Sequence, residues 1–279
     1  MRRKISLSTV AVNLVAWGLA ALWALPVVGL VMVSVRPYKE VILQGWWTLS
    51  GHFTLDNYVN ALFNPSYSLA QSYVNSFIIT IPSTIVPILL AALAAYGFSR
   101  FSFPMKSYLF LALLLIMAAP QQMVVIPLYM MLKDMRLINT FQGLILIHSS
   151  WGLAWITFFM HNFFEMLPRE IEEAARVDGA SDITIFFNIV LRLSMPALLS
   201  AAVIQFTWVW SDFFFALMFL ISPDKYVITQ RVATLRGQYY IDWGLLSAGS
   251  VLAMLVPLLI YALLQKYFIR GMVGWTVKG

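Results

Sequence analysis

The sequence predicts an all-α, polytopic membrane protein with six transmembrane helices. Hydrophobic residues make up 61% of the chain and charged residues only 11%, whereas an average soluble domain carries roughly 25% charge. Long uncharged runs recur along the chain, and a helix needs about 20 apolar residues to cross a bilayer. The mean hydropathy of +0.81 agrees with this class. We expect residues 1–279 to form a single transmembrane domain.

The uncharged runs give the six spans in chain order. We expect them at about 9–34, 72–96, 108–131, 142–162, 197–221 and 245–267. The second run is longer than one helix needs, so its front end around residues 64–68 should be a loop or an interfacial segment. Prolines inside the spans predict kinks, which membrane helices tolerate when neighbours satisfy the freed carbonyls. These prolines are Pro26, Pro82, Pro87, Pro120, Pro127 and Pro257.

The first run follows Arg2, Arg3 and Lys4, a pattern that secretory signal peptides share. A cleavable apolar region is only about 7–15 residues long, and this run is roughly twice that length. It also lacks a clear small-residue cleavage site. We therefore expect it to be retained as the first helix.

The distribution of Lys and Arg predicts the orientation, because cytoplasmic segments carry an excess of both. With the N-terminus inside, eleven of these residues fall in cytoplasmic segments and seven in outer segments. Both termini and the loop after the fourth span then face the cytoplasm. The bias accounts for the net charge of +6, so we expect membrane lipid and no nucleic acid as a partner. The absence of Cys excludes disulfides and thiolate metal sites.

The loop at 162–196 is polar and helix-forming between two apolar runs. Pro168 and the acids Glu170, Glu172 and Glu173 suit the first turn of a helix, where the helix dipole favours negative charge. This loop is therefore expected to begin with a short helix.

Further along the same loop, Gly179 suits the C-terminal cap of that helix, because glycine adopts positive φ without steric cost. Ser181 or Asp182 can cap a second helix, and Ala174 and Ala175 let another surface come close. The second helix would run through Ile183, Phe186, Phe187 and Val190. The result is a short helical bracket able to dock into a groove on a partner. The alternative is an ordinary solvated loop helix.

Two outer loops are large. Residues 35–71 are rich in aromatics, which suit a membrane-interface belt better than a partner surface. Residues 222–244 combine hydrogen-bonding and stacking side chains that suit sugar hydroxyls or a protein cleft. Those side chains are Arg231, Arg236, Gln238, Tyr239, Tyr240 and Asp242. The alternative is a solvated connector.

No catalytic residue and no metal site is expected. The chain lacks a Walker-type glycine loop, GxSxG and HExxH, and His52, His148 and His161 have no ligand partner at metal spacing. Asp212 is the one acid within a span. A carboxylate there costs about 2.5–3.5 kcal/mol on insertion scales, so it should face the bundle interior and have a polar partner. It either touches substrate on the translocation path or, as we favour, holds helices together.

These segments together resemble the inner-membrane permeases of carbohydrate ABC importers, of the smaller, maltose-transporter-like type. EIEEAARVDGASDITIFFNIVLRLSMP, at 170–196, resembles the family's EAA loop and is the most specific signal. The segment 120–140 resembles its Pro-rich third span and the following turn, and WVWSDFFFAL at 208–217 resembles a pattern in its fifth span. RGQYYIDWG and the terminal VKG also match.

The resemblance implies a type I ABC importer permease fold, in the bacterial cytoplasmic (inner) membrane, for a protein that carries a sugar, polyol or sugar derivative. Such permeases pair with a second, different permease, two ATPase subunits and an extracytoplasmic solute-binding protein. It implies no cofactor on this chain, since MgATP would be bound and hydrolysed by the ATPase subunits. This chain would convert ATPase closure into outward opening.

The resemblance also assigns residues. A coupling helix that docks into an ATPase would be formed by Glu173, Ala174, Ala175, Asp178 and Gly179. A loop that reaches into the binding protein and helps expel the sugar would be formed by Arg236, Gly237, Gln238 and Tyr239. The C-terminal tail would reach the ATPase interface.

Three positions depart from the family pattern. Arg192 replaces a proline, which either lengthens the second loop helix or places a charge at lipid headgroups or a partner. Ser211 replaces an Asn beside Asp212, and Arg136 replaces a Gly in a turn.

Two other classes stay open at this point. A stand-alone secondary transporter would need midplane ion or substrate sites, usually with internal repeats. We find no repeat and only one acid within a span. A membrane-embedded enzyme would need a catalytic pair, and the sequence offers none.

Overall fold

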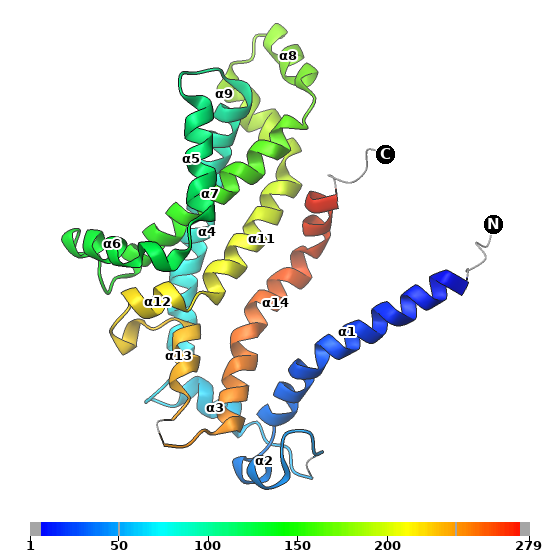
Figure 1. The fold of residues 1–279 in the computed structure, drawn as a ribbon, viewed down its shortest axis with the longest axis vertical. Coiled ribbons are helices and arrows are strands. Elements are labelled where there is room, and N and C mark those ends of the chain that lie inside the picture. Colours follow the sequence, from blue (N-terminus) through cyan, green and yellow to red (C-terminus); the bar gives the residue numbers. More distant parts are fainter. Residues whose placement is uncertain (1–6, 50, 238, 274–279) are drawn as a thin grey trace. The chain divides into compact units, whose positions relative to one another are not determined.

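A computed structural model describes the chain except for residues 1–6, 50, 238 and 274–279. All regular elements of the described residues are helical (Figure 1). The long helices are α1 (Leu7–Ser34), α4 (Leu69–Arg100), α7 (Phe141–Glu165), α11 (Met195–Ser211) and α14 (Trp243–Val273). Shorter helices are α2 (Tyr38–Gln44), α3 (Asp56–Phe63), α5 (Lys106–Ala118), α6 (Gln121–Asp134), α8 (Arg169–Val177), α9 (Asp182–Ile185), α10 (Leu191–Leu193), α12 (Phe214–Phe219) and α13 (Ile228–Thr234).

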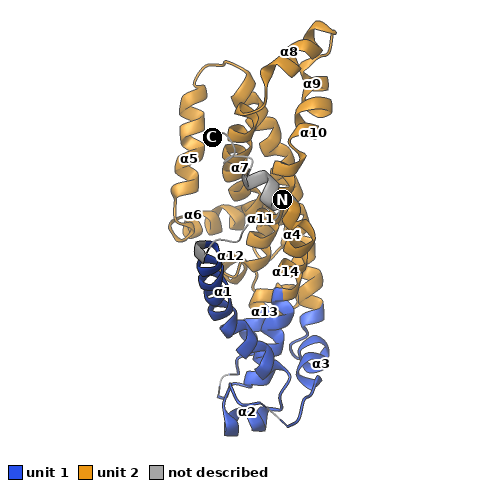
Figure 2. Cartoon of the chain, turned by 90° about the vertical axis from the view of Figure 1, so that its right-hand side faces the viewer, with its two compact units in different colours: residues 1–70, 231–254 blue, residues 71–230, 255–279 orange. Residues whose placement is uncertain are grey.

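The chain divides into two compact units (Figure 2). One comprises residues 1–70 and 231–254, and the other residues 71–230 and 255–279. The core of the second unit forms where α4 and α11 meet α7. Small residues such as Ala95 and Ala201 line two sides of it, and Met160 and Phe164 of α7 fill the space between them. Small side chains allow helix backbones to approach closely in a membrane.

Four helices are long and apolar enough to cross a membrane, and they confirm the first, second, fourth and sixth predicted spans. They are Thr9–Ser34, Leu69–Arg100, Phe141–Glu165 and Trp243–Lys266. Up to six spans result if each of two bent helix pairs counts as one. The residues 64–68 lie outside helices, between α3 and α4, as expected.

The third predicted span is not one helix. Helices α5 and α6 meet at 103° across a short break, so a continuous helix over 108–131 is wrong. Pro120 causes the break, because it has no N–H to donate and disfavours helical backbone at the residue before it. Ala119 accordingly takes extended backbone, with ψ of 126°.

The fifth predicted span, 197–221, is also wrong as a single helix. Helix α11 ends at Ser211, and Asp212 is extended, with φ of −65° and ψ of 129°. The short helix α12 follows. At its other end α11 meets the preceding loop helix, residues 182–193, at 72°. Asp212 therefore lies at a helix break and not inside a spanning helix.

Both large loops that were predicted to lie outside the membrane contain helices that were not expected from the sequence. The first loop holds α2 and α3 and closes on Arg36, which is fully buried and donates hydrogen bonds to the Gly45 carbonyl at 2.8 Å and to Gln44 Oε1 at 3.2 Å. Helix α13 occupies part of the predicted loop 222–244, and Arg231 on it is buried. Residues 226–227, 235–237 and 239–242 of this loop lie outside helices.

The orientation is open to a direct test, because the native chain has no Cys. Single cysteines at Ser181 and at Gln238 should react with membrane-impermeant maleimide from opposite sides, with the Cys at 238 reacting from outside. The reason is the bias of Lys and Arg to cytoplasmic segments. Labelling of both cysteines from the same side would contradict the six-span orientation.

Candidate functional site

The loop at 162–196 folds into the expected bracket. Helix α8 ends in a Schellman motif, in which the Ala180 N–H donates to the Ala175 carbonyl at 2.9 Å and the Gly179 N–H to the Arg176 carbonyl at 3.0 Å. Gly179 has a φ of +86°, the left-handed conformation that this motif requires and glycine adopts readily. The predicted C-terminal glycine cap is confirmed.

The second helix of the bracket starts at Ser181, whose hydroxyl accepts the Thr184 N–H at 3.3 Å. Ser181 is thus the cap, and Asp182 instead pairs with Arg176 at 2.9 Å. This hydrogen bond raises the pKa of the Arg176 guanidinium. Both partners are exposed, so the pair adds little stability.

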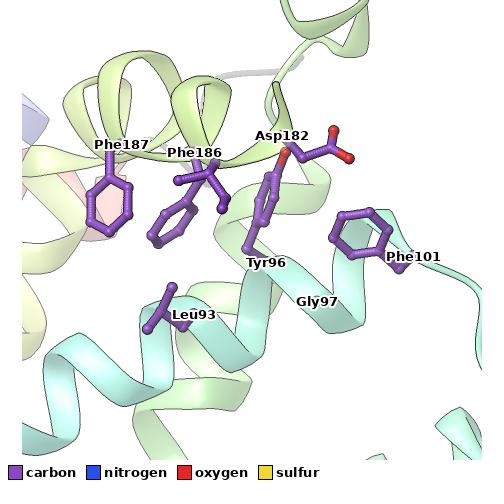
Figure 3. Close-up of a pocket in the computed structure, with 8 residues that line it drawn as sticks. Leu93, Tyr96, Gly97, Phe101, Asp182, Phe186 and Phe187 are labelled. Carbon is purple, nitrogen blue, oxygen red and sulfur yellow. The ribbon is translucent and has the colours of Figure 1, made fainter. Parts of the chain in front are cut away.

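A π turn at Phe186–Val190 joins α9 to α10, so the second helix continues to Leu193. Arg192 therefore lies on an extended loop helix and is exposed. The aromatic side of this helix faces the end of α4 across an open apolar groove (Figure 3). Tyr96 of α4 packs on Phe186 with ring centroids 5.0 Å apart, which seats the bracket on the membrane helix.

A buried ion pair holds the inner side of α8 against the ends of α4 and α7. Arg100 donates to Glu172 at 2.8 Å and also to the Phe164 carbonyl at 2.8 Å. The two side chains are only 4% and 3% exposed. The guanidinium thereby ties the ends of α4 and α7 to the bracket. The sequence alone predicts Glu172 in the first turn of a helix but indicates no partner for it.

The opposite side of α8 is open. Glu173, Ala174, Asp178 and Gly179 are exposed, whereas Ala175 packs against the core of the second unit. Val177 exposes 88% of its surface. Four of the five residues expected to dock thus face outward, and the fifth supports the helix.

Asp212 has the polar partners that a buried carboxylate needs. These partners are backbone N–H groups at the start of α12, so the carboxylate caps that helix. The Asp212 side chain, 7% exposed, accepts the Phe215 N–H at 3.4 Å and the Ala216 N–H at 3.0 Å. His148 Nε2 lies 3.7 Å from the carboxylate, and the Thr229 hydroxyl donates to the Asp212 carbonyl at 2.6 Å. These contacts join α7, α11 and α12, which supports a structural role.

The expected binding-protein loop is exposed where it is described. Arg236 and Gly237 lie on the surface, and Tyr239 exposes 93% of its area. Gln238 lies outside the described residues, and so does the C-terminal tail with VKG. Among the described residues, we find no group of three or more His, Cys, Asp or Glu that could hold a metal ion.

Apolar helices long enough to cross a membrane, two bent helix pairs and an exposed helical bracket are the features of a polytopic membrane protein. The chain belongs to the family of binding-protein-dependent transport system inner membrane components, whose model matches residues 8–274. This membership makes the chain an ABC importer permease embedded in the cytoplasmic membrane.

Similar proteins agree with this family. The chain is 57% identical over 267 residues to a probable ABC transporter permease protein of Pyrococcus horikoshii, covering 95% of this chain and 96% of that one. It is 33% identical to the trehalose/maltose transport system permease protein MalG of Thermococcus litoralis, covering 81% and 82%. It is 39% identical to the alpha-glucoside transport system permease protein AglG of Rhizobium meliloti, covering 83% and 62%. These relatives come from archaea and bacteria, so a bacterial source stays a prediction.

A solved structure shows the same fold. A chain of a bacterial ABC transporter involved in the import of the acidic polysaccharide alginate superposes with a TM-score of 0.79. The match covers 92% of this chain and 95% of that one at 22% identity. The type I importer permease fold expected from the sequence is confirmed.

Substitution of Asp212 separates its two candidate roles. If the role is structural, Asp212→Asn should keep most transport, because an amide oxygen still accepts a backbone N–H. Asp212→Leu should lower the yield of assembled complex, since buried N–H groups left without acceptors cost about 1–3 kcal/mol. Complex yield and sugar uptake are the measurements, and Asp134→Leu, at an exposed acid, is the control.

A substrate contact predicts a different result for the same variants. Asp212→Asn would then change apparent affinity or selectivity while assembly stays normal. A Leu variant that assembles and transports like the wild type would rule out both roles.

Proposed function

We propose that this chain is the permease subunit of an ATP-driven importer for a sugar, polyol or sugar derivative. In this role it converts closure of the ATPase subunits into outward opening of the transmembrane path. The named functions of its relatives support the substrate class, since they include permeases for trehalose and maltose and for alpha-glucosides. The chain carries no catalytic role in this proposal.

The observation that carries the proposal is the arrangement of α8. Its outer face, formed by Glu173, Ala174, Val177 and Asp178, is free, while Glu172 on its inner face is held by Arg100. An exposed helix laid into a groove is a common mode of protein recognition. Arg100 joins the inner side of α8 to the ends of α4 and α7. A displacement of α8 by a docked ATPase would therefore be transmitted directly to both membrane helices.

The proposed complex contains this chain, a second permease, two ATPase subunits and an extracytoplasmic solute-binding protein. MgATP would bind to the ATPase subunits. The bracket, with Ala175 and Gly179 among its residues, would dock on one ATPase from the cytoplasm. Both termini would lie on that side of the membrane.

The outer loop provides a prediction about the binding protein. Deletion of residues 237–239 should leave assembly and basal ATPase activity largely intact, because this exposed loop would lie across the membrane from the ATPases. Uptake should fall, since Arg236 and Tyr239 would no longer reach the binding protein. Uptake kinetics equal to those of the wild type would mean that the loop is only a connector.

Co-purification tests the proposed complex. A tagged chain expressed with its neighbouring genes should bring ATPase subunits and a second permease with it, and the reconstituted complex should accumulate maltose or trehalose only with ATP and binding protein. The alternative is a stand-alone secondary transporter, which the family membership does not favour. It would purify alone and respond to an ion gradient instead of ATP.

A further inference from the structure

The segment that leads from α12 into α13, residues 220–228, is bonded to α4 near the start of that helix. Asn75 donates hydrogen bonds to the Asp224 carbonyl at 2.8 Å and to the Tyr226 carbonyl at 3.0 Å. The neighbouring Ser76 hydroxyl accepts a further backbone N–H of the segment at 2.8 Å. Asn75 and Ser76 are 1% and 2% exposed, so water does not compete for these bonds. Because the starts of α4 and α7 are predicted to lie outside, this segment is called the outer strap.

A second asparagine holds the outer strap at the start of α7. Asn139 directly precedes Thr140, the residue that caps α7. The Asn139 side-chain oxygen accepts the Ile221 and Ser222 N–H groups, both at 3.0 Å, and the Asn139 carbonyl accepts Lys225 Nζ at 2.7 Å. The backbone of Asn139 has a φ of 58°, a left-handed conformation that asparagine tolerates better than most residues do. Asparagine thus satisfies both the turn and the strap.

Between their ends, α4 and α7 contribute to the same two apolar cores. Ile79 of α4 and Leu144 of α7 belong to the core that also contains Val227 of the outer strap. Ala95 of α4 and Met160 of α7 belong to the core beside the bracket. Closely packed interiors are hardly compressible and transmit strain. A displacement of one helix is therefore expected to move the other with it.

The proline in the middle of α4 would weaken this pair of helices, but α11 compensates for it. Pro87 has no N–H to donate to the carbonyl four residues earlier, which belongs to Ser83. The buried amide of Gln205 on α11 donates to that carbonyl at 3.0 Å. It also donates to the His148 carbonyl of α7 at 3.3 Å. The bond that α4 lacks is thus replaced by one that holds α7 as well.

The bracket lies at the opposite end of the same two helices (Figure 1). Arg100, the last residue of α4, joins Glu172 of α8 to the Phe164 carbonyl of α7. The two helices are therefore bonded to the outer strap at one end and to the bracket at the other. Beyond the strap the chain continues through α13 into the expected binding-protein loop, which contains Arg236.

We infer that the outer strap transmits docking of the solute-binding protein to the bracket through α4 and α7, with Asn75 and Asn139 as its positioning residues. The inference rests on the proposed function and adds a route by which docking outside the membrane raises ATP hydrolysis inside. Two distant sites are coupled when both bias the same structural element. The pair formed by α4 and α7 is bonded both to the strap and to the bracket, so both sites act on it.

The test uses the complete complex in nanodiscs with ATP and a saturating amount of binding protein loaded with maltose or trehalose. Asn139→Gly removes the side-chain bonds to the strap and keeps the left-handed backbone. It should lower the ratio of stimulated to basal ATP hydrolysis by about fivefold, near the lower end of typical coupling between two sites. Basal hydrolysis should stay unchanged, because α8 and its ion pair with Arg100 are intact. A purely structural defect would reduce the amount of active complex, lowering both rates together and leaving their ratio unchanged.

Two matched variants sharpen the result. Asn64→Gly makes the same substitution at another half-buried residue, whose side chain bonds to Ser66 and Tyr67, and should leave the ratio at the wild-type value. Asn139→Asp keeps an acceptor oxygen for the two N–H groups of the strap and should restore most of the stimulation. If Asn139→Gly lowers the yield of complex, the decision falls to Lys225→Met, which removes a single bond between the strap and residue 139 and should lower the ratio in the same direction.

The outcomes distinguish the two proposals. A wild-type complex whose ATP hydrolysis does not respond to the loaded binding protein would overturn the proposed function and this inference with it. If the wild type responds, an unchanged ratio in the deciding variant would overturn this inference alone. Equal losses in Asn139→Gly and Asn64→Gly would do the same. A variant that needs more binding protein but reaches the wild-type maximum would show that the strap serves docking only, which also contradicts the inference.

Discussion

Glu172→Gln should destabilise the assembled protein by about 3–5 kcal/mol, the usual loss when one partner of a buried ion pair is removed. The amide would leave the Arg100 guanidinium, 4% exposed, without its counter-charge. Native proteins are stable by only about 5–15 kcal/mol, so this is a large fraction of the total. The thermal denaturation midpoint of the purified complex in detergent is the measurement.

The neighbouring acid provides the control. Glu173→Gln makes the same chemical change at an exposed position on the other side of α8 and should leave the denaturation midpoint unchanged. The double variant Arg100→Leu with Glu172→Leu should recover part of the lost stability, because no buried charge remains. Equal midpoints for the Glu172 and Glu173 variants would show that the ion pair contributes nothing measurable.

Gly179→Asp should leave the protein inserted and folded but impair ATPase docking, lowering uptake about tenfold or more, which corresponds to a docking loss of about 1.4 kcal/mol. A Cβ at this position would meet no atom of the chain within 4 Å, so the fold has room for the side chain. The φ of +86° is left-handed backbone, which Asp, like Asn, tolerates better than other L-residues do. The loss of docking therefore arises mainly from the charge and the bulk that Asp places on the exposed face. Expression, co-purified ATPase and uptake are the measurements.

Gly179→Asn separates these causes, because Asn has nearly the same shape, carries no charge and tolerates left-handed backbone well. Recovery of docking by Gly179→Asn would show that the negative charge blocks docking. Failure of both variants would show that the partner approaches so closely that any side chain at this position blocks docking. Full uptake by Gly179→Asp at normal expression would mean that the bracket does not dock.

Much of the fold could be predicted because it depends on run length. The segments around α1, α4, α7 and α14 are uninterrupted apolar runs, and a bilayer requires that each be helical. Hydropathy does not report backbone breaks, however. The run that forms α5 and α6 is apolar on both sides of Pro120, and only the structure shows that the kink expected there is a bend of 103°.

In the candidate site too, local features could be predicted from the sequence, whereas contacts between distant residues could not. Gly179 was found, and Ser181 as one of two candidate caps, because caps are local and have partners within a few residues. The Arg100–Glu172 pair was missed because its partners lie 72 residues apart, and no spacing in one sequence links them. The capping role of Asp212 was missed since it depends on where α11 stops.

The π turn at Phe186–Val190 has a consequence for how this loop tolerates changes in length. A wide turn of this kind holds one residue more than a regular helical turn. Loss of a single codon within it would restore a regular helix and keep Ser181 and Pro196 in the same rotational phase. The bracket can thus lose one residue at this turn without rotating its two ends relative to each other.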